Sequence, residues 1–551
     1  MDVLHYPKTV TLALLLVQLV VGRLWKQKIS GHPLPPGPRG YPGIGNLLDI
    51  PTGRSEVKYS ELARRYGDMV YLESLGTKIL VISSLKRTTE LFEQKSSNYS
   101  DRADLPMICG QMGYEAYMSL MRYGSRWRRQ RRLFHEHYNP TAVGRLHGLI
   151  LDERRVFVQG LLKDPFGLMK SSRSYFTRTI LKATYGITPS GDDDPFITQP
   201  IKTVEGFARA GVPGTFLVDL IPALKYIPEW VPGTGWKKIA RDYRETAIES
   251  RARPFNLRKG IAPHSIASYM ISNLPNGDDP SYEEERLCAQ DATAIAYVGA
   301  RDRHRAFYSN RSLRLDPDLS LQSLAAAMSA ILHLAIRPGA QKRAQEEIDE
   351  VVGCNRLPDF SDRPRLVYIS AFLKEVFRMH PSFPLAVPHA SVEDDIHDGY
   401  FIPNGTIVIG NTWHAPLMIP HLRRHIFHDP ELYPDPFRFN PDRFIKDGQI
   451  NKKVVDPYSI AFGYGRRICP GRHMSIDSVF LMVASILAMF DINAPKDRNG
   501  NVSIKEDYMD GLLVQPKPFN CRITPRSAQH AKYIEGLSVV DPAALPMDTA
   551  Q

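Results

Sequence analysis

The feature that most constrains this chain is a glycine-rich loop near its C-terminal end, residues 462–471, with the sequence FGYGRRICPG. The loop places Cys469 two residues after Arg467 and just before an apolar, helix-like run. An arginine and the backbone N–H groups at a helix start stabilise a thiolate, so we expect them to lower the pKa of this thiol. The glycines let the backbone pass close to a flat macrocycle, where a Cβ would collide. The loop therefore has the properties that a thiolate ligand of haem iron requires.

The same loop resembles the cysteine loop of the cytochrome P-450 family, whose pattern is Phe-x-x-Gly-x-Arg-x-Cys-x-Gly, and it meets every fixed position. The resemblance implies that Cys469 is the proximal iron ligand of haem b and that Arg467 holds a haem propionate. It covers residues 1–523 and implies a mainly α fold with a minor β-sheet region, with haem between a central helix and this loop. The alternative is a buried structural cysteine, because free cysteine packs as a small apolar residue.

Two further segments fit the same expectation. Trp127 and Arg131 are four residues apart, so they share one face of a helix and could clamp a carboxylate. The resemblance implies that both contact the haem propionates. His389 follows a proline in a segment that resembles the family's strand reaching the propionates, so we include it in the cofactor site. The alternative for this basic helix is a solvated face, which we accept for its other arginines.

A third motif consists of charged residues with a structural role. Glu375 and Arg378 are three apart on a predicted helix, where they can form a local ion pair. The resemblance implies that Arg443 completes a buried triad with them on the haem side of the core. A network of this kind fixes geometry more than it adds stability, because desolvating three charges is costly.

The chain departs from the family pattern in the helix that the resemblance assigns to oxygen activation. The resemblance implies a long helix carrying an acid followed by a threonine, which deliver protons. Asp302 stands at the position of the acid, but Arg303 replaces the threonine. We therefore name Asp302 as the catalytic proton relay of a helix that is incomplete as written.

Two insertions stand out from the otherwise complete motifs. Residues 303–322 are polar and contain a proline, which should break the helix at the position of the acid–threonine pair. Residues 414–424 separate two halves that adjoin in the family. Either both belong to the protein and the oxygen chemistry is damaged, or both are translated introns. We favour introns, because local sequence and overall fold normally agree in a protein that folds. Two insertions that disrupt the fold beside otherwise complete motifs break this agreement.

The net charge indicates which partners the protein can bind, and the cysteine content indicates its redox compartment. The net charge of +11 suits an anionic membrane or an acidic protein partner. The basic residues are dispersed and no nucleic-acid-binding motif accompanies them, so we expect no nucleic-acid partner. The five cysteines show no paired motif, which argues against a disulfide framework or a zinc site and favours a reducing compartment.

The N-terminal end predicts a membrane anchor. Residues 9–22 are uncharged and flanked by basic residues, at the short limit of a spanning helix. A secretory signal peptide is the alternative, but no small-residue cleavage site follows. We expect an anchor over residues 1–28, a stiff proline-rich hinge over 29–40 and a catalytic domain over 41–523 facing the cytosol from the endoplasmic reticulum. Residues 524–551 are polar and predict a flexible tail.

Two further segments bear on the fold and on the surroundings of a pocket. Residues 69–72 and 78–82 predict strands of a small sheet near the proline hinge. Residues 213–230 are apolar, rich in proline, and could roof a hydrophobic pocket, dip into the bilayer or form an ordinary core loop. The latter segment also resembles fungal, basidiomycete-like members of the family.

The resemblance implies a monooxygenase that inserts one oxygen atom from dioxygen into a hydrophobic small molecule, in secondary metabolism or xenobiotic oxidation. Its electrons would come from NADPH through a membrane reductase. The alternatives are a peroxide-using or isomerising haem-thiolate enzyme, which would tolerate loss of the threonine, and an inactive haem-binding remnant.

Overall fold

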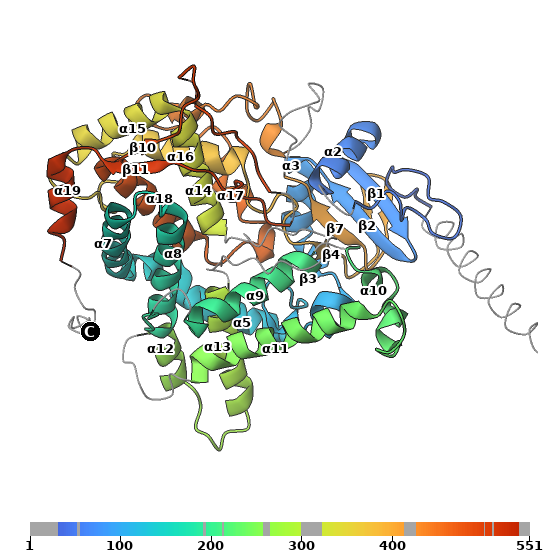
Figure 1. Cartoon of the computed structure of the whole chain (residues 1–551). Coiled ribbons are helices and arrows are strands. Elements are labelled where there is room, and N and C mark those ends of the chain that lie inside the picture. Colours follow the sequence, from blue (N-terminus) through green and yellow to red (C-terminus); the bar gives the residue numbers. More distant parts are fainter. Residues whose placement is uncertain are drawn as a thin grey trace, which may run out of the picture.

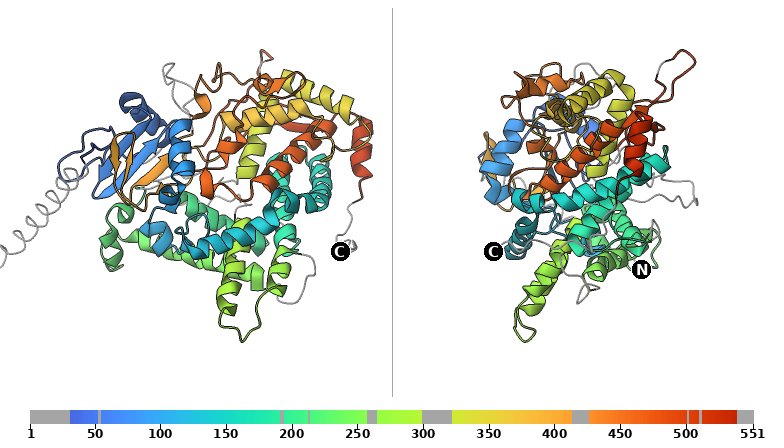
Figure 2. Two further views of the ribbon diagram at one scale, coloured as in Figure 1. Left: turned by 180° about the vertical axis from the view of Figure 1, so that it is seen from behind. Right: turned by 90° about the vertical axis from the view of Figure 1, so that its left-hand side faces the viewer.

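The computed structural model describes residues 31–51, 55–190, 194–211, 214–256, 265–298, 322–412, 426–500, 502–509 and 512–538. The predicted anchor, Asp302 and nearly all of both insertions lie outside these ranges. The described chain is mainly helical with small sheets, as expected. In Figure 1 the largest sheet lies at one end of the molecule and the helices fill the rest; the left view of Figure 2 shows the same division from behind.

The helices have the following bounds: α2 Ser55–Tyr66, α3 Leu85–Thr88, α4 Ser96–Tyr99, α5 Ser125–Tyr138, α6 Pro140–Arg145, α7 His147–Lys163, α8 Leu168–Tyr185, α9 Pro195–Ala210, α10 Leu217–Leu220, α11 Gly235–Asn256, α12 Ile266–Ser272, α13 Tyr282–Val298, α14 Gln322–Ile336, α15 Pro338–Val351, α16 Val367–Met379, α17 Tyr458–Ala461, α18 Arg472–Met489 and α19 Ala528–Glu535. Short 3-10 or π segments are η1 Thr89–Gln94, η2 Pro106–Gln111, η3 Tyr114–Ala116, η4 Pro222–Tyr226, η5 Ile426–His428, η6 Pro441–Phe444 and η7 Gly465–Arg467. The strands are β1 Met69–Ser74, β2 Thr77–Ile82, β3 Asp101–Arg102, β4 His389–Ala390, β5 Asp395–His397, β6 Tyr400–Ile402, β7 Ile407–Gly410, β8 Ile445–Lys446, β9 Gln449–Ile450, β10 Phe490–Asn493 and β11 Arg522–Pro525.

The largest sheet has the strand order β1-β2-β7-β4-β3. β1 and β2 lie where strands were predicted, and they form an antiparallel pair. β2 pairs with β7 in parallel, so segments far apart in the sequence meet at the centre of the sheet. The residues of β2 from Ile79 to Ile82 are fully buried, as is usual for a strand covered on both faces. At one side of this sheet the edge strand β3 pairs with β4, and both strands lie near the candidate site.

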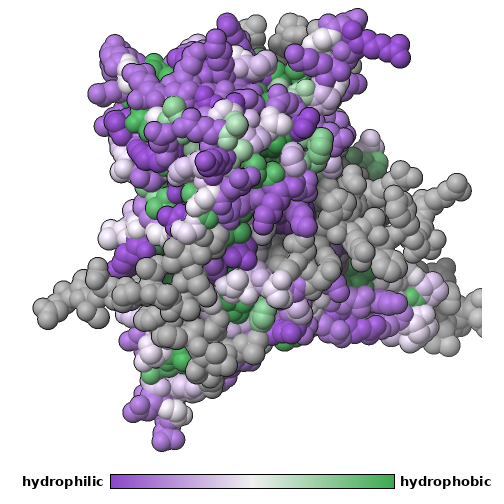
Figure 3. Space-filling view, turned by 60° about the vertical axis from the view of Figure 1, so that its left-hand side comes forward, coloured by the Kyte–Doolittle hydropathy of each residue, from purple (hydrophilic) through white to green (hydrophobic). Residues whose placement is uncertain are grey.

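Helix α18 forms the centre of the helical part. Its residues from Val479 to Met489 are almost completely buried, and the helix packs against α7, α14, α15 and α16. Within the described residues it is long and apolar enough to cross a membrane, but 78% of that window is buried inside the protein. It is therefore a core helix. On the face seen in Figure 3, the coloured surface is mainly hydrophilic with scattered apolar residues.

The proline-rich segment, which we expected to be a stiff hinge between anchor and domain, is hydrogen-bonded to β1 and β6. The Pro36 carbonyl oxygen accepts a hydrogen bond from the Tyr71 N–H, and the Pro33 carbonyl oxygen accepts one from the Phe401 N–H, both at 2.8 Å. Proline carbonyls remain free acceptors although proline itself lacks an N–H donor. The described part of the hinge, from residue 31, thus belongs to the folded domain.

The C-terminal segment also differs from the expectation of a flexible tail. Residues 522–525 form β11 beside β10, and α19 follows with Ser527 as its N-cap. Ile534 of α19 is fully buried, and the Gln159 side chain of α7 donates hydrogen bonds to the carbonyl oxygens of Ile534 and Leu537. The prediction of a flexible tail is therefore wrong up to residue 538, because one apolar helix face finds a partner in α7.

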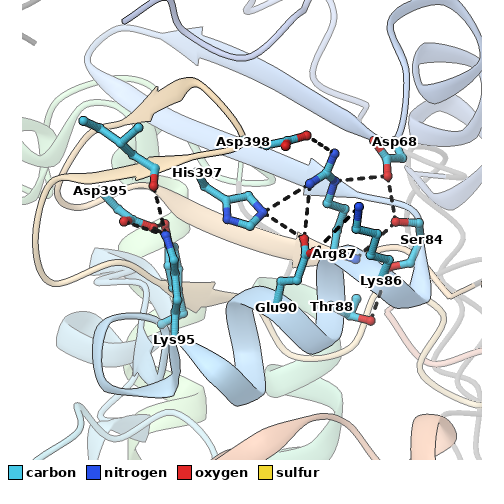
Figure 4. A network of polar contacts seen from close by, with 12 residues as sticks. Asp68, Ser84, Lys86, Arg87, Thr88, Glu90, Lys95, Asp395, His397 and Asp398 are labelled. Atoms are coloured by element: carbon cyan, nitrogen blue, oxygen red, sulfur yellow. Dashed lines mark hydrogen bonds and ion pairs between the residues drawn. The ribbon is translucent and has the colours of Figure 1, made fainter.

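A polar network secures the β5–β6 hairpin to the start of η1 (Figure 4). Arg87 contacts the carboxylates of Asp68 and Glu90 at 3.2 Å each and that of Asp398 at 2.5 Å. The His397 Nε2 atom lies 3.1 Å from Glu90 Oε2. Because the hairpin follows β4 directly in the chain, this network also holds the strand that carries His389.

Candidate active site

A cavity of about 320 Å³ lies between the 462–471 loop and helices α5 and α13. Its walls combine basic and thiol groups with apolar and aromatic groups. The lining side chains used below are Arg102, Trp127, Arg131, His389, Arg467, Cys469, Tyr114, Tyr117, Val204, Phe207, Ile295, Phe383 and Leu513. Every predicted cofactor-binding residue therefore lines the same cavity.

Cys469 sits at the end of a tight loop that precedes α18. Its backbone N–H donates a 2.7 Å hydrogen bond to the Phe462 carbonyl oxygen, which closes the loop. Gly465 has a φ of +52°, and a Cβ there would lie 2.1 Å from the Phe92 carbonyl oxygen. Only glycine satisfies both conditions, so this glycine fixes how closely the loop approaches η1.

The pKa of the Cys469 thiol is raised, contrary to our expectation of a net decrease. Burial raises it, whereas the N–H groups of Gly471 and Arg472 and the cation of Arg131 act in the opposite direction. The backbone N–H groups were anticipated, but the stabilising cations are Arg131 and Arg472 and not the expected Arg467, and desolvation outweighs all of them. The sequence could not give this balance, because it does not show how completely the thiol is buried.

Three arginines face the cavity. Arg467 donates to the carbonyl oxygens of Ser100, Met118 and Met121, at 2.7, 3.2 and 2.8 Å. Burial, together with the nearby Arg131 cation, lowers the pKa of Arg467 to about 10. Among the described residues that line the cavity, none is an aspartate or glutamate.

The third cation, Arg102, was missed by the sequence analysis. It lies on β3 directly opposite His389 of β4, and it donates to the carbonyl oxygens of Ser119, Val387 and Pro388. Burial and the neighbouring Arg467 cation lower its pKa. No local motif marks Arg102; only the pairing of two strands far apart in the sequence brings it to the cavity.

Trp127 and Arg131 share one face of α5, as predicted. The Arg131 guanidinium lies 6.0 Å from the centre of the Trp127 ring, and the Arg467 guanidinium lies 4.4 Å from it. The Trp127 Nε1–H donates to the Met118 carbonyl oxygen at 3.2 Å, so this donor has a protein partner. Among the described residues, Arg131 pairs with no carboxylate, which leaves its charge available to a ligand.

His389 is buried between the sheet and the cavity. Its ring packs on Phe92 at 4.2 Å, and its Nδ1 lies 2.7 Å from the Tyr99 carbonyl oxygen. Burial and the Arg102 and Arg467 cations lower its pKa, so the ring is neutral and its Nδ1–H donates to this carbonyl. The Nε2 atom is then left with a lone pair.

The charged triad is assembled as expected. Glu375 is fully buried, and its carboxylate accepts from Arg378 Nε at 2.7 Å and from Arg443 Nε at 3.1 Å. The backbone N–H of Asn440 also donates to it, at 2.8 Å. Arg378 in turn donates to the Phe427 carbonyl oxygen at 2.7 Å. The triad therefore ties the irregular segment from η5 to η6 onto α16.

The central helix is represented by two described parts. α13 ends at Val298 and α14 begins at Gln322, and both contribute residues to the cavity wall. Ser323, near the start of α14, lies 2.7 Å from Ser475 of α18 through their hydroxyl oxygens. The predicted proton relay, Asp302, lies between these parts and outside the described residues.

A partly buried thiol that faces a cavity with several cations and an otherwise apolar lining, in a mainly helical fold, is the arrangement that a haem-thiolate protein requires. The family model described as "Cytochrome P450" matches residues 35–289 and 323–523. The chain therefore belongs to the cytochrome P-450 family, which implies a haem-thiolate cofactor, a reductase as electron donor and a small-molecule substrate. The match stops before residues 290–322, the region that contains Asp302 and the first insertion.

The relatives narrow the class to fungal monooxygenases. The chain is 35% identical to cytochrome P-450 monooxygenase COX1 of Coprinopsis cinerea, over 93% of this chain and 95% of that protein. It is 38% identical to cytochrome P-450 monooxygenase 98 of Postia placenta, over 90% of this chain and 91% of that protein. It is 37% identical to the monooxygenase eriA of Hericium erinaceus, over 90% and 89% respectively. The expected fungal family is confirmed, and the protein is a cytochrome P-450 monooxygenase.

Proposed function

We propose that Cys469 is the axial thiolate ligand of haem b, and that Arg131 and Arg467 hold the haem propionates beside Trp127. His389 would join them by taking up a second proton beside a propionate and donating from Nε2. The observation that carries this assignment is the charge of the cavity: arginines line it without a carboxylate among its described walls. Buried cations require partners, and two propionates would supply them. Arg102 joins this set, because it lies opposite His389 and close to Arg467.

The remainder of the cavity favours an apolar substrate. Tyr114, Tyr117, Phe207 and Phe383 contribute aromatic surface, which excludes water and orients a hydrophobic molecule by shape. When bound, haem supplies the activation of dioxygen and the transfer of one oxygen atom to the substrate. The electrons come from NADPH through a membrane reductase, and the positively charged surface suits an acidic partner. Glu375, Arg378 and Arg443 hold the scaffold on the side of Cys469.

We also place the protein at the endoplasmic reticulum membrane, with the catalytic domain in the cytosol. The apolar segment 1–28 provides the anchor, and the exposed residues Leu217, Tyr226 and Trp230 support a second contact with the membrane. Their side chains are 60%, 78% and 82% exposed, which is unusual for apolar groups of this size. The fungal relatives are consistent with a role in secondary metabolism or xenobiotic oxidation.

A second candidate function is favoured by the interruption of the family match at residues 290–322. If Arg303 and the insertion belong to the mature protein, Asp302 has no threonine beside it, and oxygen activation with NADPH fails. The protein would then use peroxide, catalyse an isomerisation or bind haem without turnover. Sequencing the mature transcript across both insertions distinguishes these cases, since spliced introns would restore an acid–threonine pair.

Carbon monoxide spectroscopy tests the ligand assignment. The reduced, carbon monoxide-treated protein should give the thiolate-type absorption spectrum, and Cys469→Ser should lose it. Cys288→Ser removes another buried thiol and should keep the spectrum. A thiolate spectrum in Cys469→Ser would overturn the assignment. Product carrying one atom from labelled dioxygen supports the monooxygenase, whereas turnover with peroxide alone supports the second candidate.

A further inference from the structure

A cluster of two histidines and a glutamate lies outside the cavity and takes no part in the proposed chemistry. His333 belongs to α14, His380 follows α16, and Glu506 lies in the segment between β10 and β11. One possible ligand atom from each lies within 4.8 Å of the others. Two imidazoles and a carboxylate are a ligand set that zinc uses in proteins.

The distances suit a single small ion. His380 Nε2 lies 3.1 Å from Glu506 Oε1, and His333 Nε2 lies 3.9 Å from the same oxygen. Zinc bonds of about 2.0–2.2 Å in tetrahedral geometry place ligand atoms roughly 3.4 Å apart. The first separation is close to this value, and the second needs only a small movement of the Glu506 side chain.

His333 gives an independent indication of a ligand. The residue is fully buried, and its Nε2 has no hydrogen-bond partner among the described residues. A buried polar atom without a partner carries a desolvation cost that calls for an explanation. An ion between His333 and Glu506 would remove this cost.

The rings are held in place and stay uncharged. His333 stacks on Phe439 at 4.4 Å, and His380 stacks on Tyr508 at 4.0 Å. Burial lowers the pKa of both imidazoles, and neutral imidazole is the form that binds metals. The Glu506 side chain is 30% exposed, which leaves an entry path for an ion and room for a water ligand.

Arg337 occupies the position of a counter-ion in the metal-free state. Its guanidinium lies 2.5 Å from His333 Nδ1 and 2.9 Å from Glu506 Oε2. An arginine N–H that donates to Nδ1 leaves the ring proton on Nε2. Ion binding would shift that proton to Nδ1 and release Arg337 from His333 and Glu506. The Arg337 side chain is 30% exposed, and its guanidinium lies 4.6 Å from the centre of the Phe439 ring, a contact that does not depend on Glu506. Arg337 and a divalent ion therefore compete for Glu506.

We propose that His333, His380 and Glu506 form a binding site for a divalent cation of the zinc class, which displaces Arg337 when it binds. The site would join α14, the end of α16 and the segment that leads to Leu513 in the cavity wall. The Val514 N–H already donates to the Ser382 carbonyl oxygen at 2.9 Å, next to His380. An ion here would therefore stiffen one wall of the substrate cavity.

Calorimetric titration of the untagged, haem-loaded, full-length protein with zinc chloride, after EDTA treatment, tests the proposal. We expect binding of one ion per chain. Glu506→Gln should weaken binding by more than tenfold, since even the loss of an outer-shell partner typically costs about 10–100-fold. Arg337→Gln should strengthen it several-fold, because it removes the competing cation. A simple salt-bridge network would not produce this increase.

His530→Gln is the matched control, because His530 is also buried with an unpartnered Nε2 but lies outside the cluster. It should bind zinc as the unaltered protein does. The haem absorption spectrum of each variant verifies folding. The proposal is overturned if zinc gives no binding heat, or if Glu506→Gln and the unaltered protein bind it equally. An Arg337→Gln variant that binds more weakly would also contradict it, since Arg337 would then not compete with the ion.

Discussion

Replacing Glu375 by glutamine should destabilise the protein strongly, because the substitution removes the only negative charge of the triad. Glu375 and Arg378 are fully buried, and the Arg443 side chain is 6% exposed. The amide keeps the shape of the carboxylate but leaves two desolvated guanidinium groups without a counter-charge. Removing one partner of a buried ion pair costs about 3–5 kcal/mol. We expect a loss in this range, accompanied by release of haem at lower denaturant concentrations.

Urea unfolding, followed by tryptophan fluorescence and by haem absorbance, measures this effect through the shift of the midpoint at constant slope. The matched control is Asp442→Asn, which makes the same carboxyl-to-amide change beside Arg443. Asp442 pairs with Arg343, and both side chains are about half exposed. Exposed pairs contribute about 0–1 kcal/mol, so the control should move the midpoint little. Equal shifts for Glu375→Gln and Asp442→Asn would refute the structural role of the triad.

Three further changes have defined outcomes. Gly465→Ala should abolish haem incorporation, because the added Cβ would overlap the Phe92 carbonyl oxygen. Gly448→Ala is the control and should keep haem, since a Cβ at Gly448 meets open space. A normal haem content in Gly465→Ala would contradict the close approach of the loop to Phe92. Arg131→Met should accelerate haem transfer to an acceptor globin at least several-fold by removing a cation without a carboxylate partner; unchanged transfer would exclude Arg131 from propionate binding. Burial raises the pKa of Asp219 to about 7 from 3.8, so its contribution to stability is complete below pH 4 and is lost as the pH rises through 7. Asp219→Asn should therefore be more stable than the unaltered protein at pH 8, by about 4 kcal/mol at most, but not at pH 4. Identical pH profiles from thermal unfolding would show that Asp219 does not titrate in this range.

The sequence predicted those parts of the site that depend on local spacing. The loop of residues 462–471 carries its own turn chemistry, and the pair Glu375–Arg378 lies on one helix face, so both could be recognised without a fold. β1 and β2 were predicted from their apolar, β-branched composition. In each case the signal and the structure lie within a few residues of each other.

The parts that the sequence did not predict depend on packing between distant segments. Arg102 reaches the cavity only because β3 pairs with β4. The raised pKa of Cys469 reflects the degree of burial, which the motif does not specify. Helix α19 looked like a polar tail, because the single buried face with Ile534 is short and its partner, α7, lies far back in the chain.

The pairing of β2 with β7, and of Arg467 with Ser100, has a consequence for how the protein is made. The Arg467 hydrogen bond joins residues 367 positions apart, and the central strands of the sheet come from residues 77–82 and 407–410. At synthesis rates of about 5–20 residues per second, roughly 20–70 s separate the emergence of the two partners from the ribosome. During this interval the apolar strand β2 lacks its parallel neighbour, and the cations of the N-terminal half have no cavity to face. The largest sheet and the cavity can therefore form only after residues 407–471 have left the ribosome, so the earlier segments stay incompletely folded until translation is nearly complete.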